Sequence, residues 1–276
     1  MGYRLDLVRL PGPTTLVVVG TGGTGSLVAE GLCRLVGANP QVQLLLVDHD
    51  TIEPHNLTRQ NFLPEELGEY KARALALRLA TRYRRPIAYS LNPFSQEVLH
   101  DYGSILIGCV DNHLARRALH DAMSPQSPSY GRGGAPLLWI DSGNGEHWGQ
   151  VLVGNAWGER LKRAFREPEM VCRALPLPSI QHPQLLEAPQ VEVRPPEDCA
   201  EAVEVGVQSP TINQMMATLV VEVVRRVLAG TLDWMGVYAD LEHGLLRVVE
   251  ASPETVARVV GLKKRSLIDR SKRERR

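Results

Sequence analysis

Three side chains in the first half of the sequence have the chemistry needed to handle a triphosphate. Arg59 and Lys71 are cations, and Asp111 is a carboxylate that follows an apolar run ending at Val110. An arginine and a lysine near a phosphate-binding turn suit a triphosphate better than the pyrophosphate bridge of a dinucleotide. A carboxylate that faces phosphates needs a cation between them, and Mg²⁺ is the hard, oxygen-seeking candidate. We therefore predict that Arg59 and Lys71 contact phosphates and that Asp111 binds Mg²⁺.

The phosphate-binding turn is predicted at the glycines that follow the apolar run 16–19. Gly20, Gly22 and Gly25 satisfy the pattern G-x-G-x-x-G, and a helix-like segment follows them. Glycine permits a tight turn and a close approach of the backbone, while the helix N-terminus offers amide hydrogens and the positive end of its dipole. The pattern indicates a nucleotide without specifying which one.

Further polar residues stand where neighbouring apolar runs end. Asp48 ends the run 42–47, where a carboxylate is expected to accept hydrogen bonds from ribose hydroxyls. Asn112 has two readings, a ligand beside Asp111 or the cap of a helix that begins near His113. The predicted nucleotide-binding set is Gly20, Gly22, Gly23, Gly25, Asp48, Asp50, Asn56, Arg59, Gln60, Lys71, Asp111 and Asn112.

Alternating strand and helix signals surround these residues. Apolar runs at 16–19, 42–47, 87–90, 105–110 and 137–140 suit strands, and helical spacing of apolar residues covers 26–36 and 68–83. This alternation predicts a parallel sheet with helices on both sides. We divide one domain, 1–276, into a nucleotide-binding half (1–153), a Pro-rich crossover or insertion loop (154–206), a helix at 211–229 with two antiparallel strands (within 207–250), and a final helix and basic tail (251–276).

Composition describes an ordinary globular protein. The formal net charge is zero with 43% apolar residues, so no overall field favours nucleic acid or a membrane. Residues 263–276 contain eight Lys and Arg, which we read as a solvated end rather than a nucleic-acid-binding arm. No signal peptide or membrane-length apolar run is visible, so a cytoplasmic location is expected. The four cysteines form no C-x-x-C pair, so no zinc is expected.

The order of the motifs resembles the adenylating family of ThiF, MoeB and ubiquitin-activating enzymes. The matching pieces are G-x-G-G-x-G at 20–25, Val-Asp-x-Asp at 47–50, Asn-Leu-x-Arg-Gln at 56–60, Gly-x-x-Lys at 68–71 and Cys-x-Asp-Asn at 109–112. The resemblance continues through Gly-Gln at 149–150 and from Cys199 to Leu228. The short N-terminus and basic tail look most like the ThiF-type protein of PRTRC systems. The resemblance implies an α/β fold with a Rossmann-like ATP-binding sheet, a parallel first half, an antiparallel C-terminal extension and a long crossover loop.

The resemblance also implies an activity. It is the ATP- and Mg²⁺-dependent adenylation of the C-terminal carboxylate of a small β-grasp, ubiquitin-like protein, with release of pyrophosphate, by a homodimer. Arg59, Lys71 and Asp111 would be the catalytic residues. Cys199 matches the position at which some members form a thioester, although its neighbouring carboxylates disfavour a thiolate. Cys172 is the weaker alternative.

Other functions stay open from the sequence. The N-terminal arginine-bearing helix of the family has no match except Arg4 or Arg9, which favours an inactive nucleotide-binding scaffold. The basic tail favours a tRNA-borne or small-molecule carboxylate as substrate. A nicotinamide-dependent dehydrogenase would leave Arg59, Lys71 and Asp111 without a role. Residues 141–145 resemble a serine-hydrolase loop, but they lack a nucleophile elbow and we expect them to form a turn.

Overall fold

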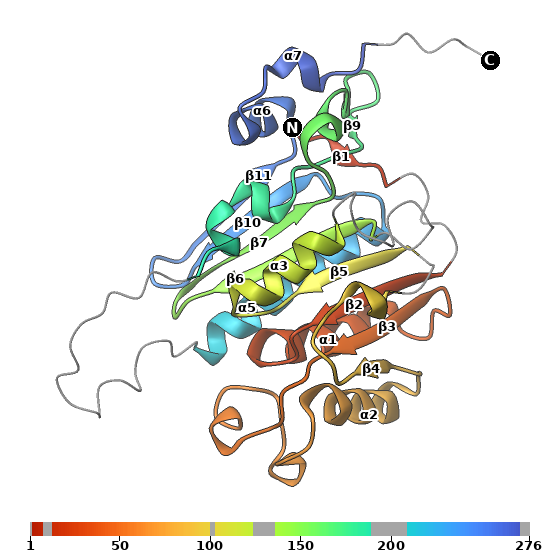
Figure 1. Ribbon diagram of the computed structural model, residues 1–276, viewed down its shortest axis with the longest axis vertical. Coiled ribbons are helices and arrows are strands. Elements are labelled where there is room, and N and C mark those ends of the chain that lie inside the picture. Colours follow the sequence, from red (N-terminus) through yellow and green to blue (C-terminus); the bar gives the residue numbers. More distant parts are fainter. Residues whose placement is uncertain (1, 8–12, 100–102, 124–135, 189–208, 271–276) are drawn as a thin grey trace, which may run out of the picture.

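An eight-stranded sheet forms the centre of the computed structural model, which describes residues 2–7, 13–99, 103–123, 136–188 and 209–270 (Figure 1). The strand order is β11-β10-β7-β6-β5-β2-β3-β4. The strands are β2 (Thr14–Val19), β3 (Val42–Val47), β4 (Ala88–Ser90), β5 (Ser104–Gly108), β6 (Leu138–Asn144), β7 (Trp148–Gly154), β10 (Trp234–Asp240) and β11 (Leu245–Glu250). The five neighbouring strands β4, β3, β2, β5 and β6 are parallel to one another. The β6–β7, β7–β10 and β10–β11 pairs are antiparallel. The predicted fold class is confirmed.

Helices cover both faces of the sheet (Figure 1). The larger apolar core lies under α1 (Gly23–Val36), α2 (Lys71–Tyr83) and α5 (Pro210–Leu228), and the smaller one lies under α3 (His113–Ala122) and α4 (Pro178–Gln181). Along β2, Leu16 and Val18 belong to the larger core while Val17 and Val19 belong to the smaller. Both faces of the strand are therefore buried, which explains why its sequence is a continuous apolar run.

Helix α5 is a core helix. Its N-cap Ser209 accepts a hydrogen bond from the Thr211 backbone at 3.2 Å, as the Ser-Pro pair predicts. It packs so closely on α1 that a Cβ on Gly31 would lie 2.6 Å from Val221 Cγ2. Its Val220 is fully buried. None of the described helices is long and apolar enough to cross a membrane.

The segment predicted as a loop, 154–206, contains short elements in its described part. These are η4 (Gly158–Leu161), β8 (Phe165–Arg166), β9 (Val171–Cys172), α4 and η5 (Pro183–Leu186). β9 pairs in parallel with β1 (Arg4–Leu5) and antiparallel with β8. The described part of this segment is thus a crossover that carries only short elements, and the strand that organises β9 lies at the other end of the sequence. Residues 189–208 lie outside the described part.

The start of the basic tail is also folded. Helices α6 (Pro253–Val260) and α7 (Lys264–Leu267) follow β11, and Leu267 is fully buried. Ile268 forms a bridge with Phe165, and Asp269 pairs with Arg166 at 3.3 Å. The expected solvated end is therefore wrong for residues 263–270, because Leu267 and Ile268 are buried and Ile268 pairs with β8. Residues 271–276 lie outside the described part.

Candidate active site

A cavity of about 1180 Å³ opens at the carboxyl ends of β2, β3 and β5. β3 and β5 lie on opposite sides of β2, so the chain changes direction at this point of the sheet. Such a switch point is where open α/β sheets bind ligands. The cavity is lined by all but one of the predicted nucleotide-binding residues: Gly20, Gly22, Gly23, Asp48, Asp50, Asn56, Arg59, Gln60, Lys71, Asp111 and Asn112.

The exception, Gly25, lies behind the turn and lets it close. A Cβ on Gly25 would lie 1.8 Å from the Gly20 carbonyl oxygen, which is shorter than any non-bonded contact. Gly20 has a φ of +83°, and its own Cβ would meet the Cys109 carbonyl at 2.7 Å. Gly20 and Gly25 are therefore required by the shape of the turn itself.

At Gly23 an added Cβ would meet a side chain rather than the backbone, and mutation can test this difference. A Cβ there would lie 2.4 Å from Asn213 Nδ2, the end of a side chain on α5. We expect Gly23→Ala to reduce the free energy of unfolding by roughly 1–3 kcal/mol, as overpacking does. The double variant Gly23→Ala/Asn213→Ala should recover part of that loss. The double variant Gly25→Ala/Asn213→Ala should recover none of the loss caused by Gly25→Ala, because the added Cβ there clashes with backbone. Urea unfolding of the single and double variants measures the coupling.

The Asp48 carboxylate links the turn after β2 to the loop after β3. Its Oδ2 accepts hydrogen bonds from the Thr21 backbone at 2.6 Å and from Thr21 Oγ1 at 3.0 Å, and its Oδ1 accepts from the Asp50 backbone at 3.0 Å. Three of about four acceptor positions of the carboxylate are thus used within the protein. This leaves one position for a ribose hydroxyl, the role predicted from the sequence.

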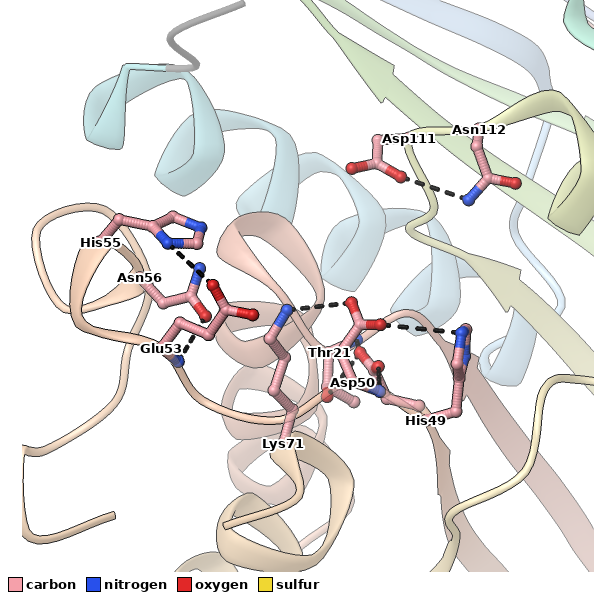
Figure 2. Close-up of polar contacts among 10 residues, drawn as sticks. Thr21, His49, Asp50, Glu53, His55, Asn56, Lys71, Asp111 and Asn112 are labelled. Carbon is pink, nitrogen blue, oxygen red and sulfur yellow. Dashed lines mark hydrogen bonds and ion pairs between the residues drawn. The ribbon is translucent and has the colours of Figure 1, made fainter. Parts of the chain in front are cut away.

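Lys71 is the first residue of α2, and only 8% of it is exposed. Its Nζ lies 3.1 Å from Asp50 Oδ2, and its backbone N–H donates to the Asp50 carbonyl at 2.9 Å (Figure 2). A buried ammonium needs such a partner. Asp50, whose side chain is 56% exposed, therefore holds the lysine at the cavity wall.

The loop after β3 carries the remaining predicted phosphate ligands. Asn56, which is 2% exposed, ends η1 (Pro54–Asn56), and its Oδ1 accepts from the Glu53 backbone at 3.0 Å. Arg59 lies one turn later and lines the cavity, with no side-chain hydrogen bond or ion pair to the described residues. Gln60 Oε1 is buried without a partner in the described part of the chain. This loop, which also includes η2 (Pro64–Glu66), therefore presents a cation and an amide to the cavity.

Asp111 and Asn112 form the opposite wall, apart from Lys71 and Asp50 (Figure 2). Asn112 caps α3, because its Oδ1 accepts from the Ala115 backbone at 2.9 Å; the cap reading is confirmed. Asp111 is exposed, and its carboxylate receives only a 3.4 Å contact from Asn112 Nδ2 among the described residues. An exposed carboxylate at the wall of this cavity fits Mg²⁺, which keeps waters and substrate oxygens as its other ligands.

Sequence reasoning missed a third part of the cavity, the end of β6. Residues 142–144 line the cavity and pair with β7, so the turn predicted at 141–145 is wrong. Asn144 Nδ2 and Thr24 Oγ1 both donate to Asn213 Oδ1, at 3.0 and 3.1 Å. Arg116 also lines the cavity and is paired with the fully buried Asp141. The apolar run before Asp141 was the available signal, but it does not reveal the strand β7 that extends the pairing.

Among the described cysteines and N-terminal arginines, only Cys109 lines this cavity. Cys172 is fully buried, and burial raises the pKa of its thiol to about 12, which opposes a nucleophilic role. Arg4 lies in β1, beside a separate cavity of about 450 Å³. Cys199 and Arg9 lie outside the described residues, so their roles stay predictions.

One pH-sensitive contact joins His182 to Tyr238 of β10. His182 Nε2 lies 2.6 Å from Tyr238 Oη, and burial lowers the pKa of His182 from 6.5. Because the unfolded chain then binds the proton more readily, stability is lost as the pH falls below about 6.5 and levels off below the folded-state pKa. We expect the melting temperature to fall less between pH 7 and pH 5 in His182→Gln than in the parent protein. An equal fall in both would contradict this assignment.

Comparison with known proteins agrees with the arrangement. The model of the ThiF family matches residues 13–237. The chain belongs to the ThiF family. This ThiF-family chain is 30% identical over 159 residues to ubiquitin-like modifier-activating enzyme 5 of Dictyostelium discoideum, covering 48% of this chain and 36% of that protein. The same enzyme of Branchiostoma floridae is 29% identical over 150 residues, covering 48% and 34%. The matched region spans about a third of these relatives.

Solved structures agree on the fold. The crystal structure of E. coli MccB has a TM-score of 0.57 at 14% identity, covering 89% of this chain and 64% of MccB. PaaA gives a TM-score of 0.55 at 16% identity, covering 89% and 66%. MccB has also been solved with ATP, with a TM-score of 0.54 at 13% identity, covering 89% of this chain and 65% of that one. The ThiF-family sheet of this chain is thus shared with these proteins.

Proposed function

We propose that this chain catalyses the ATP-dependent adenylation of the C-terminal carboxylate of a small ubiquitin-like, β-grasp protein. The observation that carries the proposal is that Arg59, the buried Lys71 and the exposed Asp111 line one cavity together with the glycine turn. The relatives named ubiquitin-like modifier-activating enzymes support the substrate class, and the ATP complex of MccB supports the nucleotide.

The reaction needs little from the protein beyond alignment and charge. A carboxylate oxygen of the substrate attacks the α-phosphorus, a new O–P bond forms, and the bond from that phosphorus to the bridging oxygen breaks. Pyrophosphate leaves with the electron pair, and the product is an acyl-adenylate. No base is required, because the carboxylate is already ionised at neutral pH. Alignment of the two reactants and neutralisation of the leaving group supply the catalysis.

Each wall of the cavity has a part in this step. The backbone of the glycine turn at Gly20, Gly22 and Gly23 receives the α-phosphate, and Asp48 accepts a ribose hydroxyl. Arg59, Lys71 and the loop amides of Asn56 and Gln60 contact the β- and γ-phosphates. Mg²⁺ held by Asp111 would neutralise charge on the leaving pyrophosphate.

Finer parts of the proposal come from the family resemblance. The active form is a cytoplasmic homodimer of the PRTRC type, in which Arg4 or Arg9 is the candidate for the arginine that reaches the partner subunit's site. The Cys199 thiolate then attacks the acyl carbon of the adenylate, so that a C–S bond forms, the C–O bond to the phosphate breaks and AMP leaves. The buried, high-pKa thiol of Cys172 favours Cys199 for that role.

Exchange of labelled pyrophosphate into ATP, measured with candidate β-grasp proteins, tests the proposal. We expect exchange that depends on the protein's free C-terminus, and an adenylated C-terminus by mass spectrometry. Binding of ATP without exchange in the presence of any such protein would indicate an inactive scaffold instead. Exchange only with small-molecule carboxylates or with a tRNA-borne carboxylate would replace the substrate class.

A further inference from the structure

Two basic segments that lie far apart in the sequence meet at one end of the molecule. One is 155–173, which carries η4, β8 and β9, and the other is 251–270, which carries α6 and α7. The Arg163 backbone N–H donates to the Ser266 carbonyl at 2.9 Å and joins them. In Figure 1, α7 lies at one end of the molecule, and α2 and the loop after β3 lie at the other.

The region formed by these two segments is basic although the whole chain has no net charge. The segments contain ten Lys and Arg residues against five Asp and Glu residues. Three of the five carboxylates form ion pairs within the region: Glu159 with Lys162, Asp269 with Arg166 and Glu254 with Lys264. The other two, Glu167 and Glu169, lie in the turn between β8 and β9.

Four exposed cations surround the contact between the two segments: Arg163, Arg173, Lys263 and Arg265. We call them the basic patch. The Arg173 N–H donates to the carbonyl next to Arg163 at 2.8 Å, and the Ser266 N–H donates to the Lys263 carbonyl at 2.9 Å. None of the four side chains has a hydrogen bond or ion pair with the described residues. Because like charges repel when no counter-charge lies between them, this surface favours a partner with several negative charges.

The side chains around the basic patch distinguish among such partners. Val259 is the one large apolar residue that is exposed in the described segments 155–173 and 251–270. Protein interfaces have an apolar core, and helices that lie on membranes insert apolar side chains. Single-stranded nucleic acid stacks its bases on aromatic rings, but the half-buried ring of Trp157 already lies under Arg160, 5.8 Å from its centroid. The phosphate backbone of a duplex requires only cations that meet its regularly spaced charges.

We propose that the basic patch binds the phosphate backbone of duplex nucleic acid. Arginine and lysine side chains contact phosphate oxygens and hold the duplex without reading its sequence. The patch lies at the opposite end of the molecule from the loop after β3, so the duplex is held away from the loop that carries Arg59 (Figure 1). The inference therefore does not depend on the proposed adenylation.

Fluorescence anisotropy of a short labelled DNA duplex of mixed sequence tests the proposal on the full chain. With about 0.9 in the slope of log K against log salt for each neutralised phosphate, four cations predict that affinity falls by on the order of 100-fold or more between about 50 and 200 mM salt. The variant Lys263→Gln/Arg265→Gln should lower that slope by about 1.8 and bind more weakly at low salt. Arg163→Gln/Arg173→Gln should give the same change independently.

Arg84→Gln/Arg247→Gln is the matched control, because it removes two exposed cations that lie outside the two segments. Arg84 also shares a left-handed backbone with Arg163, with φ values of +49° and +57°. The control should keep the affinity and the salt slope of the parent protein. All three variants should melt at the parent temperature, because none of the replaced side chains donates a hydrogen bond to the described residues.

Equal salt slopes for the parent protein and the two patch variants would overturn the inference, as they would if residues 271–276 alone carried the binding. Tighter binding of the single strand than of the duplex, or equal binding of polyglutamate, would also overturn it. ATP–pyrophosphate exchange by the patch variants should equal that of the parent protein, and a loss would assign the patch to the acyl substrate instead. Salt-sensitive duplex binding without exchange by any of the proteins would remove the proposed function and leave this inference standing.

Discussion

Replacing Asp111 with asparagine is expected to reduce ATP–pyrophosphate exchange by at least about 100-fold, the usual effect of losing one electrostatic element of a transition state. The side chain is exposed at the cavity wall, and its contact with Asn112 at 3.4 Å is too weak to matter for folding. The neutral amide keeps the shape and removes the charge that would hold Mg²⁺. The variant should therefore melt at the parent temperature and still bind ATP.

The matched control is Asp121→Asn, which removes an exposed carboxylate from the same helix region, α3, away from the cavity. Exchange by this variant should equal that of the parent protein. Raising the Mg²⁺ concentration should recover part of the activity of Asp111→Asn, because a weakened metal site fills at higher concentration. Exchange within threefold of the parent at low Mg²⁺ would contradict the role given to Asp111.

Lys71→Met is expected to weaken ATP binding and to reduce exchange by about 100-fold or more. A unit charge about 4 Å from a phosphate is worth ~4 kcal/mol near a protein surface before desolvation, and a tenfold rate change corresponds to about 1.4 kcal/mol. The folded state should lose little stability, because the partner of Lys71, Asp50, is 56% exposed and can be hydrated when left alone. Calorimetric titration with ATP measures the first effect, and exchange measures the second.

Arg73→Met is the matched control for this change. Arg73 lies two residues further along α2, is paired with Glu69 at 2.7 Å and does not line the cavity. It should bind ATP as the parent does. If Lys71→Met and Arg73→Met bind ATP equally well, the assignment of Lys71 to the phosphates is wrong.

Asp50→Asn separates the two tasks of the ion pair. It removes the partner of Lys71 and leaves the ammonium in place, so ATP binding should fall less than in Lys71→Met. Phosphates are expected to replace the carboxylate as the partner of Lys71, because the ammonium can offer three donors. A larger loss in Asp50→Asn than in Lys71→Met would indicate that Asp50 itself contacts the ligand.

The sequence alone determined the parallel half of the fold and its nucleotide-binding edge. The glycine pattern at 20–25, the polar residues after β3 and β5, and Lys71 at the start of α2 are local signals. Each is produced by a strand that ends in a turn, and parallel strands bring such turns to one edge of the sheet. Their gathering on one cavity follows from this topology.

Only the tertiary structure decided the parts that depend on distant partners. The segment expected to be a loop forms β8 and β9 because β9 pairs with β1, and the basic segment 263–270 docks because Leu267 and Ile268 have a surface to cover. Asp141 to Asn144 belong to a strand because β7 folds back along them. The β1–β9 pairing and the Phe165–Ile268 bridge join chain segments far apart in sequence, and no local periodicity encodes them. The close approach of Asn213 to Gly23 arises in the same way.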